Sequence, residues 1–313
     1  MLRRILRKST ASLFLLLSAC GLTSRCGAPD PVDEATFNAL YASPNGIPDA
    51  PLKVYHLGHS LVGPYMPMML QQLADTGHGY NSQLGWGSPL QQHWEPDVPI
   101  NGFEESNGPP AYRDAKEAMA SGEYDAVVLT EAVEIRDTIK YHDPHDYLRK
   151  WAVAAWDGNP DTRVYLYETW HTLDDAEGWL ERLDLDLERY WEGKILRPAL
   201  AYEEVNNPIY IIPAGQVMAS FVRKVEAAGG IGAIRDRTDL FDDDIHFSHF
   251  GGYLVALTHY AVLYGRSPVG LPHKMRLPDG STADDPGPEA ARVMQETVWE
   301  VVTSYPPSGV RQN

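Results

Sequence analysis

The chain has 313 residues, of which 43% are hydrophobic and 22% are charged, a composition typical of a globular protein and unlike that of a disordered one. Its formal charge of −17 at pH 7 would repel a phosphate backbone, which excludes nucleic acid as a partner. The two cysteines, Cys20 and Cys26, precede the region expected to fold, so a disulfide framework is excluded as well. We expect one folded domain over residues 34–313.

The first nineteen residues have the pattern of a secretion signal. Four basic residues lie within the first eight positions, and an apolar stretch follows over residues 11–19. This stretch is well short of the ~20 apolar residues that a membrane-spanning helix needs. We therefore assign residues 1–19 to a signal peptide and residues 20–33 to a polar tether.

The signal ends in a sequence that predicts lipidation. Residues 17–20 read Leu-Ser-Ala-Cys and resemble the lipobox of bacterial lipoproteins, in which the cysteine is lipidated and becomes the new N-terminus. Gly21 follows, where an Asp would resemble an inner-membrane retention signal. We therefore expect an exported protein that contacts the outer membrane only through Cys20. The alternative is an ordinary signal peptide, after which Cys20 and Cys26 could pair in a small disulfide loop.

Beyond the tether, short apolar runs alternate with stretches of helical periodicity, which is the pattern of βαβ units around a parallel sheet. The apolar runs predict five strands, at residues 52–57, 80–84, 125–130, 163–169 and 208–213. The helical spacing predicts helices around residues 66–73, 179–191, 253–260 and 289–303. The segment 85–110 is too long for an ordinary connection, so we expect it to border a binding site.

A serine follows the first predicted strand. Residues 58–63 read Gly-His-Ser-Leu-Val-Gly and precede an amphipathic helix, so Ser60 lies at a strand-to-helix turn. At such a turn the hydroxyl points beyond the carboxyl end of the sheet, and the N–H groups that begin the helix face any oxyanion formed there. Taken alone, the serine is more readily explained as a structural helix cap.

An aspartate and a histidine near the other end of the chain give the serine a catalytic context. Asp243 and His246 lie three residues apart in the sequence Asp-Asp-Ile-His. The carboxylate can bond one imidazole nitrogen and leave the other free to take a proton from Ser60. For the pair alone, a core histidine beside a solvated acidic loop is the alternative. Together with the serine, the pair predicts a nucleophilic site.

The motifs Gly58-His59-Ser60-Leu61 and Asp243-x-x-His246 resemble blocks I and V of the SGNH (GDSL) hydrolase superfamily. The resemblance spans about residues 52–265. It implies a three-layer α/β/α sandwich of the flavodoxin-like kind with a mostly parallel five-stranded sheet. It also implies Ser60 as nucleophile, His246 as general base and Asp243 as the group that orients the base. Esters would be hydrolysed through an acyl-enzyme, with neither a metal nor an organic cofactor.

The resemblance places further residues in an oxyanion hole. In the family, the N–H of the nucleophile, here Ser60, is joined by a glycine N–H, and Gly85 or Gly87 fits that place, with Gly87 favoured. After the third strand the family has an asparagine donor, whereas this chain has Thr130 and Glu131. An ionised Glu131 cannot donate a hydrogen bond. Either this side chain is protonated in an apolar site, or Thr130 donates, or the hole has two backbone donors only.

Aromatic and polar residues gather at the predicted strand ends and suggest substrate contacts. Trp86 follows the second strand and Trp170 the fourth, and His59 stands beside the serine where the family usually has Asp or Asn. Flat aromatic faces suit sugar rings, and ligands bind at the carboxyl edge of open α/β sheets. We therefore predict Trp170, Trp86 and His59 as substrate contacts, with an anchor in the core as the alternative for each tryptophan.

These features predict an exported serine esterase that hydrolyses a carboxylic ester, with an O-acetyl group on a carbohydrate as the expected substrate. One alternative is an O-acyltransferase that passes the acyl group to a glycan with the same triad. Another is a non-catalytic lipoprotein that binds a glycan or another solute on the same scaffold. The histidine pairs at 142/145 and 246/249 lack a convincing third ligand, so we predict no metal site.

Overall fold

The computed structural model describes residues 29–63, 65–74 and 76–312. The predicted signal peptide, the predicted lipidation site Cys20 and the second cysteine, Cys26, lie outside these residues and stay predictions. Within the described ranges, no helix combines the length and the apolar character needed to cross a bilayer.

Five parallel strands form a single sheet in the order β2-β1-β3-β4-β5. The strands are β1 (Lys53–His59), β2 (Gly79–Gly85), β3 (Ala126–Leu129), β4 (Arg163–Glu168) and β5 (Ile209–Pro213). They are mostly buried because helices cover both faces of the sheet, which also explains why they read as apolar runs in the sequence. The predicted parallel sheet of the flavodoxin-like kind is confirmed, and each predicted strand end lies within two residues of the observed one.

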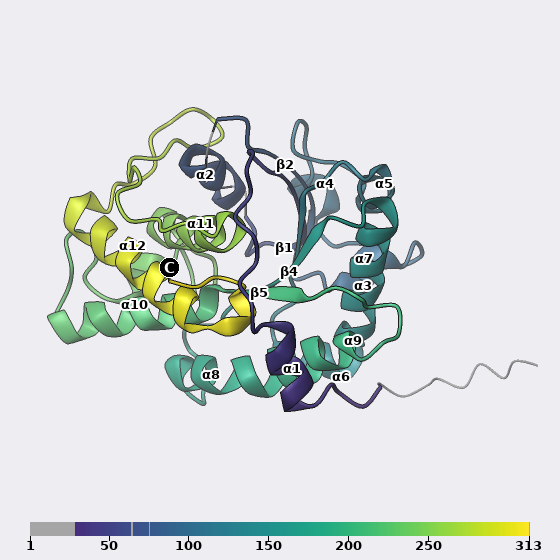
Figure 1. Ribbon diagram of the computed structural model, residues 1–313. Coiled ribbons are helices and arrows are strands. Elements are labelled where there is room, and N and C mark those ends of the chain that lie inside the picture. The colour runs from purple at the N-terminus through teal and green to yellow at the C-terminus, as the bar shows by residue number, and fades with distance from the viewer. Residues whose placement is uncertain (1–28, 64, 75, 313) are drawn as a thin grey trace, which may run out of the picture.

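Two layers of helices sandwich the sheet (Figure 1). One face is covered by α2 (Met66–Leu73), α8 (Trp179–Asp186), α10 (Ala214–Ala228), α11 (His249–Tyr264) and α12 (Gly287–Ser304). The other face is covered by α1 (Glu34–Leu40), α3 (Leu90–Trp94), α5 (Ala115–Ser121), α6 (Ile135–Tyr141), α7 (Pro144–Gly158), the π-helical segment η1 (Leu187–Leu196) and α9 (Arg197–Leu200). Short helical turns complete the chain at α4 (Phe103–Ser106), η2 (Arg237–Leu240) and η3 (Pro306–Ser308).

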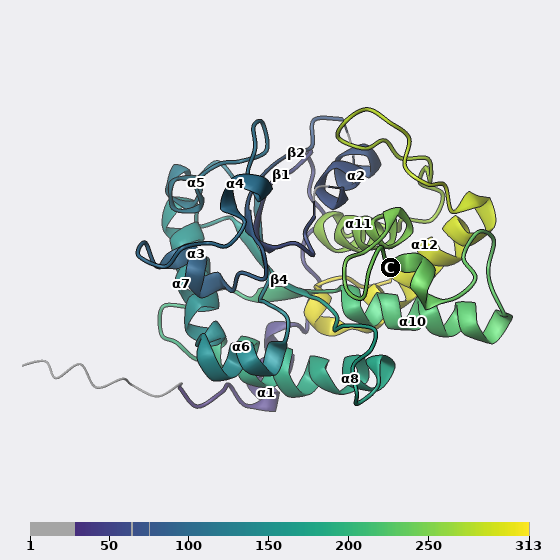
Figure 2. The ribbon, with the colours of Figure 1, turned by 180° about the vertical axis from the view of Figure 1, so that it is seen from behind.

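The strand order fixes where a ligand site can form. From β1 the chain passes to β2 on one side and then crosses to β3 on the other side, so the connecting helices lie on opposite faces of the sheet. In such sheets a crevice opens outside the carboxyl ends of the two strands between which the direction of winding reverses, here β1 and β3. Ser60 directly follows β1 and Glu131 closely follows β3, so both lie at this point of the fold. Figure 2 shows the strands between α2 and α11 on one side and α5 and α7 on the other.

Helix α11 brings the C-terminal motif to the same place. It is apolar all round, and its residues from Gly251 onward are buried, as expected for a helix in the middle of a layer. It packs against α2, the helix that follows Ser60. Because His246 lies just before α11 begins, the packing of these two helices sets the histidine beside the serine.

Candidate active site

Ser60, His246 and Asp243 come together from opposite ends of the chain. The imidazole Nε2 of His246 lies 2.9 Å from Ser60 Oγ, and its Nδ1 lies 2.7 Å from Asp243 Oδ2. The histidine side chain is 45% exposed, so solvent and substrate can reach it. The structure therefore brings together the three residues that the sequence predicts for a nucleophilic site.

The carboxylate of Asp243 is fixed by backbone N–H groups and faces the ring of His246. Its Oδ1 accepts hydrogen bonds from the backbone N–H groups of Ile245 and His246, at 2.8 and 2.7 Å, while Oδ2 faces the ring. Partial burial opposes the negative charge, but the hydrogen bonds from His246 and Ile245 outweigh it and lower the pKa of Asp243 to about 2. The ionised carboxylate favours a proton on Nδ1, which leaves Nε2 free to accept the proton of Ser60.

Two cavities open at the serine. The smaller has a volume of about 310 Å³ and the larger about 700 Å³. Both are lined by Ser60, His246 and Trp86, so the indole stands where the two spaces meet. An ester bound at Ser60 therefore has room for groups on both sides of its carbonyl carbon.

Trp86 is held in place by a glycine. The side chain is 55% exposed, and its indole lies on the backbone of Gly102, where a Cβ would come within 2.2 Å of a ring atom. Gly102 also has a φ of +62°, which other residues rarely adopt. The segment 85–110 thus borders the cleft as expected, and Trp86 of this segment lines both cavities.

Of the two glycines considered for the oxyanion hole, Gly87 lies in the cleft. It lines the larger cavity beside Ser60, has a φ of +58°, and has open space where a Cβ would stand. Gly85 instead ends β2, and a Cβ there would come within 2.3 Å of both Ile100 and Ser88. Close packing therefore requires glycine at position 85, whereas Gly87 lines the larger cavity beside Ser60.

Glu131 does not take the expected place of an oxyanion donor. The residues that line the two cavities do not include it. One carboxyl oxygen accepts the N–H of Leu90 at 3.2 Å, at the start of α3, and the other has no partner among the described residues. Burial raises the pKa of Glu131 to about 8, so the side chain is a neutral acid at pH 7. The hydroxyl of Thr130 donates to the carbonyl of Tyr167 at 2.8 Å, which removes the alternative donor.

His59 ties the nucleophile turn to the neighbouring strand. Its Nε2–H donates to the carbonyl of Glu131 at 2.7 Å, and its Nδ1 accepts the N–H of Leu61 at 3.3 Å. Burial lowers the pKa of His59 to about 4, so the ring is neutral. It lines the larger cavity, but both nitrogens are already engaged. His59 therefore fixes the turn with both nitrogens, and its role as a substrate contact stays a prediction that its place in the cavity lining allows.

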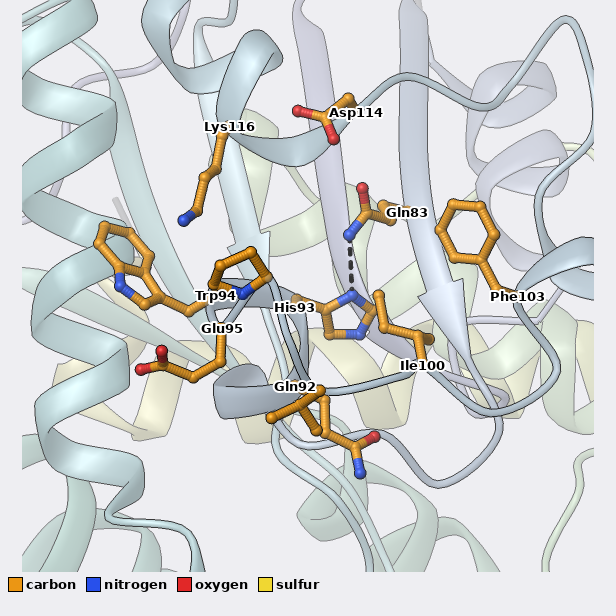
Figure 3. A pocket seen from close by; sticks show the side chains of 11 residues that line it. Gln83, Gln92, His93, Trp94, Glu95, Ile100, Phe103, Asp114 and Lys116 are labelled. Carbon is orange, nitrogen blue, oxygen red and sulfur yellow. Dashed lines mark hydrogen bonds between the residues drawn. The ribbon is translucent and has the colours of Figure 1, made fainter.

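A second histidine supports the turn from behind, and sequence reasoning missed it. His93 donates from Nε2 to the carbonyl of Gly58 at 2.9 Å and accepts the amide of Gln83 at its Nδ1, at 3.1 Å. The two side chains line a separate cavity of about 250 Å³, which Ser60 does not line. Figure 3 shows the hydrogen bond between them. A histidine in a short helix after β2 carries no sequence signal for such a role.

The prediction that Trp170 is a substrate contact is wrong. Its side chain is only 1% exposed and packs against Phe241 and Phe247, beneath the loop that carries His246. Its Nε1–H donates to the carbonyl of Ile245 at 2.8 Å. The ring therefore belongs to the core, although it follows its strand at the carboxyl edge.

In the part of the chain that the structure describes, no three His, Cys, Asp or Glu residues are grouped so that they could hold a metal ion.

Comparisons with known proteins add evidence about the fold. No family model and no curated protein matches the sequence. Among solved structures, a protein of the DUF4886 family from Bacteroides uniformis is similar over 82% of this chain and 96% of its own, at 16% identity and a TM-score of 0.53. A candidate GDSL-like lipase from Parabacteroides merdae is similar over 71% and 99%, at 15% identity and a TM-score of 0.37. At these identities the likeness to the DUF4886 protein shows the α/β fold alone.

Proposed function

We propose that the protein is a serine ester hydrolase of the SGNH type that works through an acyl-enzyme on Ser60. The observation that carries this proposal is the continuous hydrogen-bonded chain from Ser60 through His246 to the ionised Asp243. It stands at the carboxyl edge of a flavodoxin-like sheet, with two cavities open at the hydroxyl. The nucleophile after the first strand and the Asp-x-x-His motif near the end support the same assignment.

In the proposed reaction, Ser60 Oγ forms a bond to the ester carbonyl carbon while His246 Nε2 takes the hydroxyl proton. Asp243 stabilises the resulting imidazolium, and the N–H groups of Gly87 and Ser60 face the oxyanion. The bond to the alcohol then breaks, and the alcohol leaves with the proton from His246. Water, which gives a proton to the same nitrogen, attacks the acyl-enzyme. The carboxylic acid departs, and the proton returns to Ser60.

We propose hydrolysis over acyl transfer because water can reach the site. His246 is nearly half exposed, and both cavities border Ser60 directly. A transferase has to keep water from the acyl-enzyme, which needs a closed site. Export and anchoring through Cys20 belong to the same proposal and rest on the sequence pattern of residues 1–20.

The substrate that we propose is a neutral ester, such as an O-acetyl group on a carbohydrate. The exposed indole of Trp86 offers a flat face to a sugar ring. Glu105 and Asp242 line the smaller cavity, and none of the described residues that line either cavity is a lysine or arginine. Glu134 lines the larger cavity, but its charge is paired with Arg136 and Arg182. This charge pattern disfavours an anionic alcohol or acyl group.

Acetate release tests the proposal. The purified mature domain is incubated with a neutral acetylated oligosaccharide and, separately, with a fluorophosphonate that labels activated serines. We expect acetate release together with labelling at Ser60. A protein that binds the oligosaccharide but neither releases acetate nor takes the label would be a binding lipoprotein, and the esterase proposal would be rejected.

Removal of the indole of Trp86 is expected to weaken binding of a sugar ester. The Trp86→Ala variant should raise KM for an acetylated oligosaccharide about tenfold, which corresponds to ~1.4 kcal/mol, because it loses the stacking surface. KM for p-nitrophenyl acetate should change less, since this ester has no sugar ring. Leu185→Ala removes an exposed apolar side chain outside both cavities and serves as the control. Equal KM changes for the two esters would contradict the platform role.

The acidic lining is expected to make the enzyme discriminate by charge. At low ionic strength, kcat/KM for an acetylated uronic-acid oligosaccharide should be about tenfold lower than for a neutral one of equal length. The gap should narrow in 0.5 M salt and in a Glu105→Gln, Asp242→Asn double variant. Asp161→Asn, which lies beyond the amino end of β4 at the opposite edge of the sheet, should leave the gap as it is. A gap that neither salt nor the double variant changes would show that the lining does not select charge.

A further inference from the structure

The turn over residues 243–246 is held by the loop that follows β4. The carbonyl of Asp244 accepts the N–H of Leu173 at 2.8 Å, and the carbonyl of Ile245 accepts the Nε1–H of Trp170 at 2.8 Å. These are the two carbonyls between the aspartate and the histidine of the triad. The loop after β4 therefore fixes the middle of the turn, while Asp243 fixes its N–H groups.

We infer that Trp170 is a positioning residue for the general base, an inference that rests on the proposed function. Its ring lies 6.2 Å from the ring of Phe241 and 6.1 Å from that of Phe247, in edge-on contacts measured between centroids. These phenylalanines flank the turn and are bridged to each other by backbone pairing. The side chain of Trp170 thus contacts both residues that flank the turn, through its ring, and the centre of the turn next to His246, through its hydrogen bond to Ile245.

The loop after β4 is itself anchored by buried charge. Arg182 on α8 is 1% exposed and donates to Asp175 at 2.7 Å and to Glu134 at 2.9 Å. The indole N–H of Trp179 donates to the carbonyl of His171 at 3.0 Å. Moving the loop would take Asp175 away from this buried guanidinium, which is unfavourable. Trp170 therefore connects the catalytic turn to a rigid support.

This connection should matter for the rate more than for binding. His246 Nε2 has to stay within hydrogen-bond reach of Ser60 Oγ, and a misplacement of about 1 Å can cost ~100-fold in rate. Trp170 is buried and lines neither cavity, so it does not touch a bound ester. Loss of its N–H leaves the carbonyl of Ile245 without this donor and loosens the turn, while the substrate contacts stay.

The test compares Trp170→Phe with Trp156→Phe. Trp156 also donates its indole N–H to a backbone carbonyl, that of Thr162 at 3.0 Å, but it lies just before β4 at the far edge of the sheet. We measure kcat and KM for p-nitrophenyl acetate, the rate of fluorophosphonate labelling and the melting temperature. Trp170→Phe should lower kcat and the labelling rate about tenfold, with KM within about twofold of the wild type. Trp156→Phe should lose comparable stability but keep kcat. Equal kcat in both variants, or a change confined to KM, would overturn the inference.

A second substitution separates the N–H from the shape of the ring. Benzothienylalanine at position 170 has the same two fused rings, with sulfur in place of the N–H group. The same tenfold loss of kcat is expected, also where Trp170→Phe fails to fold. Full activity with this residue would show that packing alone matters and would overturn the role of the N–H. A wild type that neither hydrolyses esters nor takes the label rejects the proposed function itself, whereas an active wild type beside an equally active variant rejects only the role of Trp170.

Discussion

Replacing Ser60 by alanine is expected to lower kcat for p-nitrophenyl acetate by roughly 10⁴-fold or more, because the variant has no group that can form the acyl-enzyme. The substitution removes one hydroxyl at the edge of a cavity, so the melting temperature should change little. His246→Ala should have an effect of the same order, since Ser60 then has no base 2.9 Å away to take its proton. Steady-state hydrolysis and fluorophosphonate labelling measure both losses.

The rate losses caused by substitutions in the triad should also not be additive. Because the three residues act as one unit, a Ser60→Ala, His246→Ala double variant should be no slower than either single variant. Ser121→Ala, at the end of α5, removes a comparable hydroxyl far from the cleft and should keep wild-type kcat. Hydrolysis by Ser60→Ala at the wild-type rate would show that any esterase activity comes from another site.

The fold could be predicted because its strands are buried on both faces. Both faces of a strand such as β3 are buried, so apolar and polar residues do not alternate along it. In the sequence it therefore appears as an apolar run between turn residues. The helices gave weaker signals. The regular spacing over residues 179–191 predicts one helix, whereas the structure changes there from α8 to the wider π-helical winding of η1. The apolar residues of α8 pack on one face of the sheet and those of η1 on the other, and the spacing of apolar residues along the sequence does not reveal this change.

The triad could be predicted, and its supports could not. Ser60 is recognisable because it directly follows the first strand. His246 is recognisable because it stands three residues after an aspartate and just before a helix. Trp170 follows its strand just as a ligand contact would, and only the packing around it decides that the ring points into the core. Glu131 is a neutral acid, as one of the three alternatives requires, but it lies outside the lining of both cavities, and only the packing around it decides this. Tertiary environment, which the local sequence does not encode, makes these distinctions.

The free energy of unfolding is expected to peak near pH 6.5, and buried histidines cause the fall on the acid side. Burial lowers the pKa values of four of them to about 4, from 6.5 in the unfolded chain; these are His59, His78, His93 and His259. The unfolded chain binds more protons between those values, so this stability is complete above pH 6.5 and is lost as the pH falls toward 4. Each group loses roughly 2 kcal/mol by pH 5, so the total reaches several kcal/mol.

Two buried glutamates cause the fall on the alkaline side. Burial raises the pKa values of Glu131 and Glu168 to about 8, from 4.5 in the unfolded chain. Here the folded protein binds more protons, so stability decreases as the pH rises from 4.5 to 8. Between pH 6.5 and 8 each group loses roughly 1.5 kcal/mol. Below pH 6 the histidines outnumber the glutamates, and their opposite effect prevails.

Urea denaturation at intervals from pH 5 to pH 8.5 measures both limbs of this profile. Glu131→Gln and Glu168→Gln should each flatten the alkaline limb by about half, because glutamine keeps the shape of the neutral acid but cannot ionise. Glu203→Gln, at an exposed position, should leave the limb unchanged. If the double replacement leaves the decrease of stability above pH 6.5 unchanged, neither carboxyl group contributes to it, which means that both are already ionised inside the folded protein. Burial would then not keep them protonated, and the explanation of Glu131 as a neutral acid beside the nucleophile turn would fail with it.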